Sequence, residues 1–256
     1  MKPLLLAIGL YSAALSSHSL AACNSDHFDS EGIVAYAFDG DTVELVDGRH
    51  VRFIGINTPE VGHRGQASQP LADAARAHLM SLLPKGAHVR LRLDQEKNDH
   101  YQRLLAHVFT DDGQNINELQ LVGGFATTLI VPPNLWQREC YATVERAARD
   151  ARRGIWALPN YQAISSNSLT ISDNGYYIVH GQVTSVRRVR DGIWVNLSGS
   201  LGLKIEQADM SYFSVADLSA LSGMNVEARG WLHPDKKQLR LRMQIRHPSD
   251  LARIDR

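Results

Sequence analysis

Short stretches of alternating apolar and polar residues dominate the first half of the chain. Alternation with a period of two is typical of β-strands that bury one face and expose the other. Five stretches follow this pattern, and they cover residues 33–38, 42–46, 50–56, 88–94 and 103–109. The pattern therefore predicts a strand-rich N-terminal region.

Between the third and fourth of these stretches, apolar residues recur every three or four positions, as they do on one face of a helix. Five of them share one stripe: Leu71, Ala74, Ala75, Leu79 and Leu82. Two later segments, 115–124 and 138–154, also predict helices. Five strands with a helix after the third are the order of a small Greek-key barrel of the OB type. We therefore expect a mostly β, α+β fold in which three helices pack outside a five-stranded barrel.

The second half of the chain repeats this order of elements. A short helix is expected at Val215–Leu221, between the third and fourth of five strand-like stretches at 176–186, 192–197, 201–206, 225–232 and 239–246. This order predicts a second small OB-like β-barrel over residues 176–256. The intervening segment 158–175 is rich in serine, asparagine and other turn formers. It is expected to be a linker that follows a first domain at 22–157.

The N-terminus has the features of a secretory signal peptide. One lysine precedes an apolar run from Leu4 to about Leu15, and small residues then suit cleavage after Ala21. Residues 1–21 are therefore expected to be removed on export, which places the mature protein in the periplasm or outside the cell. A transmembrane span is not expected.

Cys23 leaves two outcomes open. Residues 20–23 resemble a bacterial lipobox, in which Cys23 would carry a lipid anchor to the cell envelope. Ordinary cleavage would instead leave Cys23 and Cys140 as the two cysteines of an exported chain. Such a pair in an oxidising compartment favours a disulfide over free thiols, so Cys23–Cys140 is the expected bond.

Composition limits the classes of function. The chain has 256 residues, of which 44% are hydrophobic and 21% charged, as in a folded soluble protein of one or two domains. Its 27 basic and 27 acidic residues give a formal net charge of zero. A nucleic-acid partner would therefore be recognised by local basic groups, because there is no global attraction to polyanions.

The first predicted hairpin carries polar groups at one end. With Asp47-Gly48 as a two-residue turn, Val43 pairs with Arg52, and Asp41 lies near the loop 57–60. The polar side chains around Asp41 and those of the loop 57–60 therefore lie at the same end of the hairpin.

Hard oxygen atoms gather at that end of the hairpin. The Asp41 carboxylate, the Asn57 amide oxygen and the Thr58 carbonyl are ligands of the kind that Ca²⁺ prefers. They form a candidate calcium site without an EF-hand loop.

Charged groups suited to phosphate chemistry accompany these oxygens. Arg52 and Arg103 can reach a phosphate held at the metal, and Glu60 supplies a carboxylate beside it. Phosphodiester hydrolysis needs a cation and arginines for the growing charge, and a carboxylate to orient or deprotonate water.

These residues resemble the staphylococcal nuclease (thermonuclease) family. The motif Asp-Gly-Asp-Thr at 39–42, an arginine five residues before the Asn-Thr-Pro-Glu loop at 57–60, and a Tyr-x-Arg at 101–103 occur in family order and spacing. The resemblance covers about residues 33–156 and leaves the C-terminal third outside it.

The resemblance implies a role for each residue. It assigns calcium binding to Asp41, Asn57 and the Thr58 carbonyl, phosphate binding and transition-state charge to Arg52 and Arg103, and activation of water to Glu60. It also implies cleavage of DNA and RNA to 3′-phosphate products. One departure is Asn57, since the family usually has a second metal-binding aspartate there. A neutral amide should hold Ca²⁺ more weakly.

The second domain offers a separate group of basic and aromatic residues. Its first hairpin carries Arg187, Arg188, Arg190 and Trp194, and Tyr101 accompanies Arg103 in the first domain. Aromatic stacking combined with phosphate contact suits single-stranded nucleic acid. The alternative is that the tryptophan belongs to the core and the arginines are solvated, and the sequence does not decide between the two.

Two functions of different classes remain open from the sequence. One is an exported, calcium-dependent phosphodiesterase that acts as a monomer on DNA and RNA, with single strands preferred. The other is a non-catalytic nucleic-acid-binding protein made of two OB-fold modules.

Overall fold

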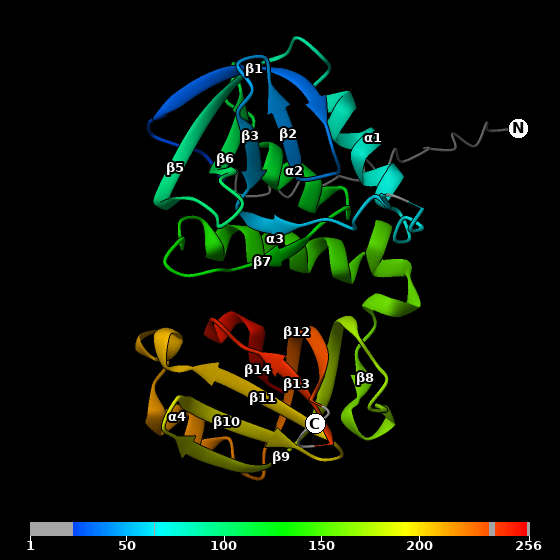
Figure 1. The fold of residues 1–256 in the computed structure, drawn as a ribbon, viewed down its shortest axis with the longest axis vertical. Coiled ribbons are helices and arrows are strands. Elements are labelled where there is room, and N and C mark those ends of the chain that lie inside the picture. The colour runs from blue at the N-terminus through cyan, green and yellow to red at the C-terminus, as the bar shows by residue number, and fades with distance from the viewer. Residues whose placement is uncertain (1–22, 64, 236–238, 255–256) are drawn as a thin grey trace, which may run out of the picture.

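The chain folds into two β-barrels, shown in Figure 1. The structure is a computed structural model, and it describes residues 23–63, 65–235 and 239–254. The expected signal peptide, residues 1–21, lies outside the described residues. None of the helices in these ranges is long and apolar enough to cross a membrane.

The first domain is a closed five-stranded barrel with the strand order β1-β2-β3-β6-β5. β3 and β6 run parallel, whereas the other neighbouring pairs are antiparallel. This is the pairing of an OB fold. The strands are β1 (Ser30–Ala37), β2 (Thr42–Leu45), β3 (His50–Phe53), β5 (His88–Asn98) and β6 (Leu104–Thr110).

The three expected helices accompany this barrel, and they are α1 (Ala72–Leu82), α2 (Ile116–Val122) and α3 (Arg138–Asp150). α1 buries Ala75 and Leu79, which lie on one face because four residues separate them. Leu79 packs in the apolar core that fills the barrel. Burial of this stripe, rather than a side-chain cap, fixes the helix.

The hairpin between β2 and β3 has a different register from the one predicted. Thr42, rather than Val43, lies opposite Arg52. The predicted two-residue turn is wrong because the loop spans residues 46–48. Gly48 in this loop has a φ of 86°, a left-handed conformation that glycine adopts without strain.

The strand predicted at 50–56 is broken after Phe53. β4 (Gly55–Asn57) leaves the barrel and pairs with β7 (Thr127–Leu129) in a separate two-stranded sheet. Gly55 makes the bend possible, because its φ is 83° and an added Cβ would lie 2.8 Å from the ring of Tyr141. The bend carries the chain to the loop that contains the expected metal ligands.

The second domain closes in the same way as the first. Its strands pair in the order β9-β10-β11-β13-β12, and β12 pairs with β9 to complete the ring. β11 and β13 are parallel, as β3 and β6 are in the first barrel. The prediction of an OB-type barrel followed by a second OB-like barrel is therefore confirmed. The elements are β9 (Gly175–Val189), β10 (Gly192–Leu197), β11 (Leu201–Glu206), α4 (Val215–Ala220), β12 (Asn225–Asp235), β13 (Arg240–Gln244) and the edge strands β8 (Ile164–Ser165) and β14 (Leu251–Arg253).

The segment between the barrels packs against both of them. Tyr161 lies near Trp156 and Tyr176, with ring centroids 6.0 Å apart in each pair. β8 pairs with β9 and so joins the second barrel. The stretch expected as a linker thus takes part in the contact between the barrels. Its short 3₁₀ turns are Pro159–Tyr161 and Ser166–Ser168, after a first turn at Gly154–Ala157.

Ion pairs join the two barrels where α3 and β7 face the second domain (Figure 1). Arg149 of α3 bonds Glu227 of β12 at 2.7 Å, and Arg229 of β12 bonds Glu145 of α3 at 2.6 Å. The second pair is almost fully buried. The two domains therefore share a specific interface.

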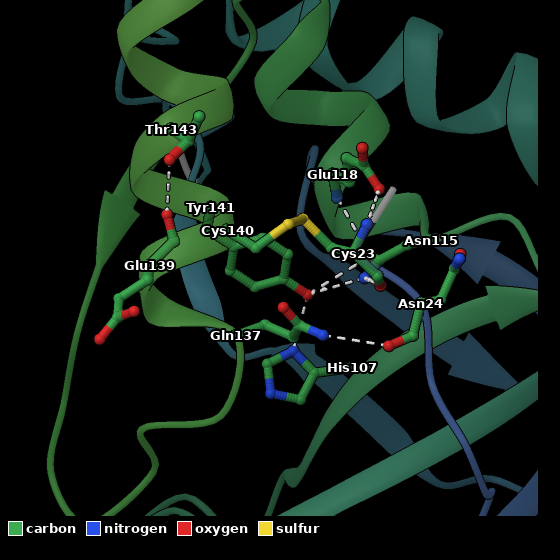
Figure 2. The surroundings of a disulfide bond; sticks show 10 residues. All are labelled: Cys23, Asn24, His107, Asn115, Glu118, Gln137, Glu139, Cys140, Tyr141 and Thr143. Atoms are coloured by element: carbon green, nitrogen blue, oxygen red, sulfur yellow. Dashed lines mark hydrogen bonds between the residues drawn. A yellow bond between two sulfur atoms is a disulfide. The ribbon is translucent and has the colours of Figure 1, made fainter. Parts of the chain in front are cut away.

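Cys23 and Cys140 form the expected disulfide (Figure 2). The main-chain N–H of Cys23 donates to the Glu118 carboxylate at 2.8 Å, and the Asn115 amide donates to the Cys23 carbonyl at 2.8 Å. These contacts fix the chain before β1 against α2 and α3. A lipid on Cys23 would need the same sulfur atom, so the disulfide and a lipid anchor exclude each other.

Candidate active site

Asp41 lies in the turn between β1 and β2, with 1% of its surface exposed. One of its carboxylate oxygens accepts a hydrogen bond from the main-chain N–H of Thr58 at 2.7 Å, and the other accepts from the Thr42 hydroxyl at 3.1 Å. The bond to Thr58 joins the first turn of the barrel to the loop after β4. The structure therefore brings together the two segments that the sequence pointed to.

Arg52 extends from β3 into this junction. Its Nε lies 3.2 Å from a carboxylate oxygen of Asp41, and one terminal nitrogen donates to the amide oxygen of Asn57 at 3.1 Å. The other terminal nitrogen donates to the carbonyl of Ile56 at 3.0 Å. The guanidinium thus lies between Asp41 and Asn57 and is held in one orientation.

Glu60 lies at the surface on the loop that follows Thr58. Its main-chain N–H donates to the Gln69 side chain at 3.0 Å, and the N–H of Gln69 donates back to the Glu60 carbonyl at 2.9 Å. The pKa of Glu60 is raised by partial desolvation and by the charge of Asp41, against the opposing effect of the two arginines. Glu60 is therefore within electrostatic reach of the whole group.

Arg103 precedes β6 and is oriented by Asp99. Its Nε donates to one Asp99 oxygen at 2.7 Å, and its main-chain N–H donates to the other at 2.9 Å. The ring of Tyr101 is exposed and lies 5.6 Å from the Arg103 guanidinium carbon. Asp99 therefore positions Arg103 and leaves part of its guanidinium accessible.

Arg52 and Arg103 line one pocket of about 390 Å³, which we call the arginine pocket. Its wall also includes Asp99 and His100 from the loop before β6, and Leu129 at the end of β7. A third arginine, Arg246, reaches it from the second barrel. The pocket therefore has three arginines and two carboxylates, Glu96 and Asp99, in its wall, and Arg52 links it to Asp41.

Asp39 is a further member of this group that sequence reasoning did not assign. Its carboxylate is buried and accepts a hydrogen bond from the main-chain N–H of Asp41 at 2.9 Å. Burial, followed by the neighbouring Asp41 charge, raises the pKa of Asp39 to about 7. The signal was present in the sequence, because two acids two residues apart in a tight Asp-Gly-Asp turn must lie close together.

The oxygen atoms at this junction fit a calcium ion in their chemistry. Asp41 offers a buried carboxylate, Asn57 an amide oxygen and Thr58 a main-chain carbonyl, all hard donors. Asp39 adds a second buried carboxylate, whose oxygen accepts the main-chain N–H of Asp41 at 2.9 Å. Within the described residues no group of three or more His, Cys, Asp or Glu side chains could hold a metal, and two of the expected ligands are of other types.

The second-domain residues proposed for nucleic-acid contact lie elsewhere. Trp194 is on β10, opposite Arg187 of β9, and it lines neither the arginine pocket nor the adjacent pocket between the barrels. Arg240 stacks over the Trp194 ring at 3.7 Å, and the Nζ of Lys204 lies 5.2 Å from it. Arg187, Arg188 and Arg190 are exposed. Cations therefore already pack against this tryptophan.

Comparison with known proteins extends the description. Residues 50–158 match the family described as Staphylococcal nuclease homologue. The chain is 29% identical over 137 residues to Endonuclease YhcR of Bacillus subtilis, which is 49% of this chain and 11% of that protein. It is 35% identical over 130 residues to Probable endonuclease LCL3 of Schizophyllum commune, covering 45% of this chain and 43% of that protein. It is 30% identical over 130 residues to Endonuclease YncB of Bacillus subtilis, covering 49% and 61%.

The family match runs from β3 of the first barrel to just past α3 and does not include β1 and β2. The matching region spans less than two thirds of the length of each of these three relatives. The second barrel lies outside the family match. The closed barrel with its three helices agrees with this match, in which residues 50–158 are similar to the staphylococcal nuclease family.

Proposed function

We propose that the chain is an exported, calcium-dependent nuclease that hydrolyses phosphodiester bonds. The observation that carries this proposal is the contact network of Asp41, Arg52, Asn57 and Thr58, with Glu60 in electrostatic reach. The family match and the endonuclease names of the relatives support the same class of activity. The disulfide supports an oxidising compartment outside the cytoplasm.

Arg52 and Arg103 bind the phosphate and stabilise its transition state. Both line the arginine pocket, and each is oriented by a carboxylate, Asp41 for Arg52 and Asp99 for Arg103. Guanidinium groups donate paired hydrogen bonds to phosphate oxygens. Because their orientation is fixed before substrate arrives, little reorganisation is needed as charge grows on those oxygens.

Glu60 accepts a proton from the attacking water. Desolvation and the Asp41 charge raise its pKa, which makes the carboxylate a stronger base, and Arg52 and Arg103 oppose this shift.

Asp41, the Asn57 amide oxygen and the Thr58 carbonyl would hold the calcium ion. When bound, Ca²⁺ supplies positive charge against the phosphate oxygens and a site that orients water. Since Asn57 is neutral, this set should bind the ion less tightly than one with a second carboxylate.

DNA and RNA are both proposed as substrates of a monomeric enzyme. The arginines recognise phosphate, which the two polymers share, and such contacts carry no base sequence information. Single strands are preferred because their phosphates can enter a pocket without the constraint of a paired partner. Products with a 3′-phosphate follow from the family resemblance.

Release of acid-soluble nucleotides from denatured DNA, with and without a calcium chelator, tests the proposal. Arg103→Gln and Glu60→Gln should each lower turnover at least about a hundredfold, since each removes charge stabilisation or proton transfer. Arg76→Gln, on the outer helix α1, is the matched control and should keep normal turnover. Wild-type protein that binds denatured DNA with calcium but releases no nucleotides would replace the proposal with a non-catalytic binding protein of two OB modules.

A further inference from the structure

Arg246 brings a charge from the second barrel into the arginine pocket. It follows β13, far from the nuclease domain in sequence, yet it lines the same pocket as Arg52 and Arg103. Its side chain is 40% exposed, so it is accessible to a ligand. The pocket is therefore built by both domains.

Arg246 is the least firmly paired of the three arginines. Arg52 and Arg103 each bond a carboxylate at 3.2 Å or less. The Nε of Arg246 lies 3.6 Å from an Asp209 oxygen. That nitrogen is itself buried and has no hydrogen-bond partner among the described residues. The donors of this guanidinium that remain for a ligand are its terminal nitrogens, and a phosphate oxygen would accept from them.

The arginine pocket continues along the contact between the barrels. A second pocket of about 180 Å³ is lined by residues of β7 and β12, among them Thr128, Trp231 and His233. Leu129 and Arg246 line both pockets, so the two are adjacent. Arg103 lines the first of these adjacent pockets and Trp231 the second, and we call the two together the interdomain groove.

The interface holds the two sides of this groove in place. Arg229 of β12 donates to Glu145 at 2.6 Å and to the Thr128 hydroxyl at 2.9 Å. Thr128 lies on β7, opposite Ile56 of β4. The second barrel is thus bonded to the same small sheet that carries Asn57, and Arg246 has a defined position relative to the site.

We propose that the second barrel completes the substrate-binding groove of the nuclease and that Arg246 binds a backbone phosphate of single-stranded nucleic acid next to the cleaved bond. This inference rests on the proposed function. The strand would run along the interdomain groove, with Trp231 offering an aromatic surface to an unpaired base. The three arginines outnumber the two carboxylates of the arginine pocket, Glu96 and Asp99, and so favour a polyphosphate chain. The alternative use of Arg246 is its 3.6 Å contact with Asp209, a carboxylate whose side chain is only 5% exposed.

Arg246→Gln and Arg242→Gln in the full-length protein form a matched pair for the test. Arg242 lies on β13, is 42% exposed and pairs with Glu206 at 3.9 Å, but it lines neither pocket. Arg246→Gln should raise KM about tenfold for a single strand of about eight nucleotides, and far less for a dinucleotide, because the dinucleotide lacks the phosphate beyond the cleaved bond. Arg242→Gln should change neither value.

Salt dependence supplies an independent readout. Binding of the longer strand is measured at several salt concentrations in a Glu60→Gln background, which removes the proposed base. Loss of one phosphate contact should reduce the slope of log K against log salt by about 0.7 for a single strand. Arg246→Lys should keep the slope, since it retains the charge, and the melting temperature checks that each variant is folded.

The outcomes separate the two proposals. If wild-type protein cleaves and Arg246→Gln matches Arg242→Gln in both length dependence and salt slope, the groove inference is wrong while the nuclease proposal stands. If wild-type protein does not cleave at all, the nuclease proposal is the one that fails.

Discussion

Loss of Arg229 should weaken the contact between the barrels more than loss of any half-exposed arginine there. Arg229 donates to Glu145 and to the Thr128 hydroxyl, and the side chains of Arg229 and Glu145 are only 13% and 6% exposed. Arg229→Met keeps the apolar stem of the side chain and removes the guanidinium. Glu145 then remains as a buried carboxylate without its cation.

The expected cost of Arg229→Met is about 3 to 5 kcal/mol in the free energy of unfolding, which is the usual range for breaking one side of a buried ion pair. The second interdomain pair provides the comparison. Arg149 bonds Glu227 through two contacts of 2.7 and 2.9 Å, but these side chains are 36% and 23% exposed. Arg149→Met should therefore cost about 1 kcal/mol.

Thermal unfolding of the full-length protein measures both effects. A loss of 3 to 5 kcal/mol should lower the melting temperature by roughly 6 to 20 °C in a protein of this size, against about 2 to 4 °C for Arg149→Met. Adding Glu145→Gln to Arg229→Met should recover part of the loss. The amide removes the unpaired charge and still accepts the hydrogen bond from the Thr128 N–H. Equal melting temperatures for the two single variants would refute the reasoning from burial.

Three further predictions concern pH, the disulfide and the metal. Burial raises the pKa of Asp250 from its ordinary 3.8 to about 7, so the folded protein holds this proton more tightly than the unfolded chain does. The free energy of unfolding should therefore fall as pH rises from about 4 to about 7. Asp250→Asn should raise the melting temperature at pH 8 and leave it unchanged near pH 4. The Cys23→Ser, Cys140→Ser double variant should have a free energy of unfolding about 2 to 4 kcal/mol lower, because the disulfide closes a long loop. Urea unfolding measures this difference, and an unchanged midpoint would contradict the prediction. Asn57→Asp should tighten Ca²⁺ binding about tenfold in titration calorimetry, or roughly 1.4 kcal/mol, and unchanged affinity would show that Asn57 is not a ligand.

The order of the elements and the grouping of Asp41, Arg52 and Thr58 could be predicted from the sequence. Alternation and helical spacing are local properties of the chain, and they predicted both five-stranded barrels with a helix after the third strand. The polar groups of the first barrel could be found for the same reason. Asp41, Arg52 and Thr58 lie within one hairpin and its following loop, so their spacing along the chain limits their distance in space.

Other features could not be predicted, because they depend on contacts between distant segments or on one extra loop residue. The register of the first hairpin followed from a loop over 46–48, because a single residue moves every pair by one position. The pKa of Asp39 depends on how deeply the folded barrel buries it beside Asp41. Arg246 joined the arginine pocket only because the second barrel docks on α3 and β7. No local pattern encodes that docking, which results from side chains of two separately folded barrels burying one another.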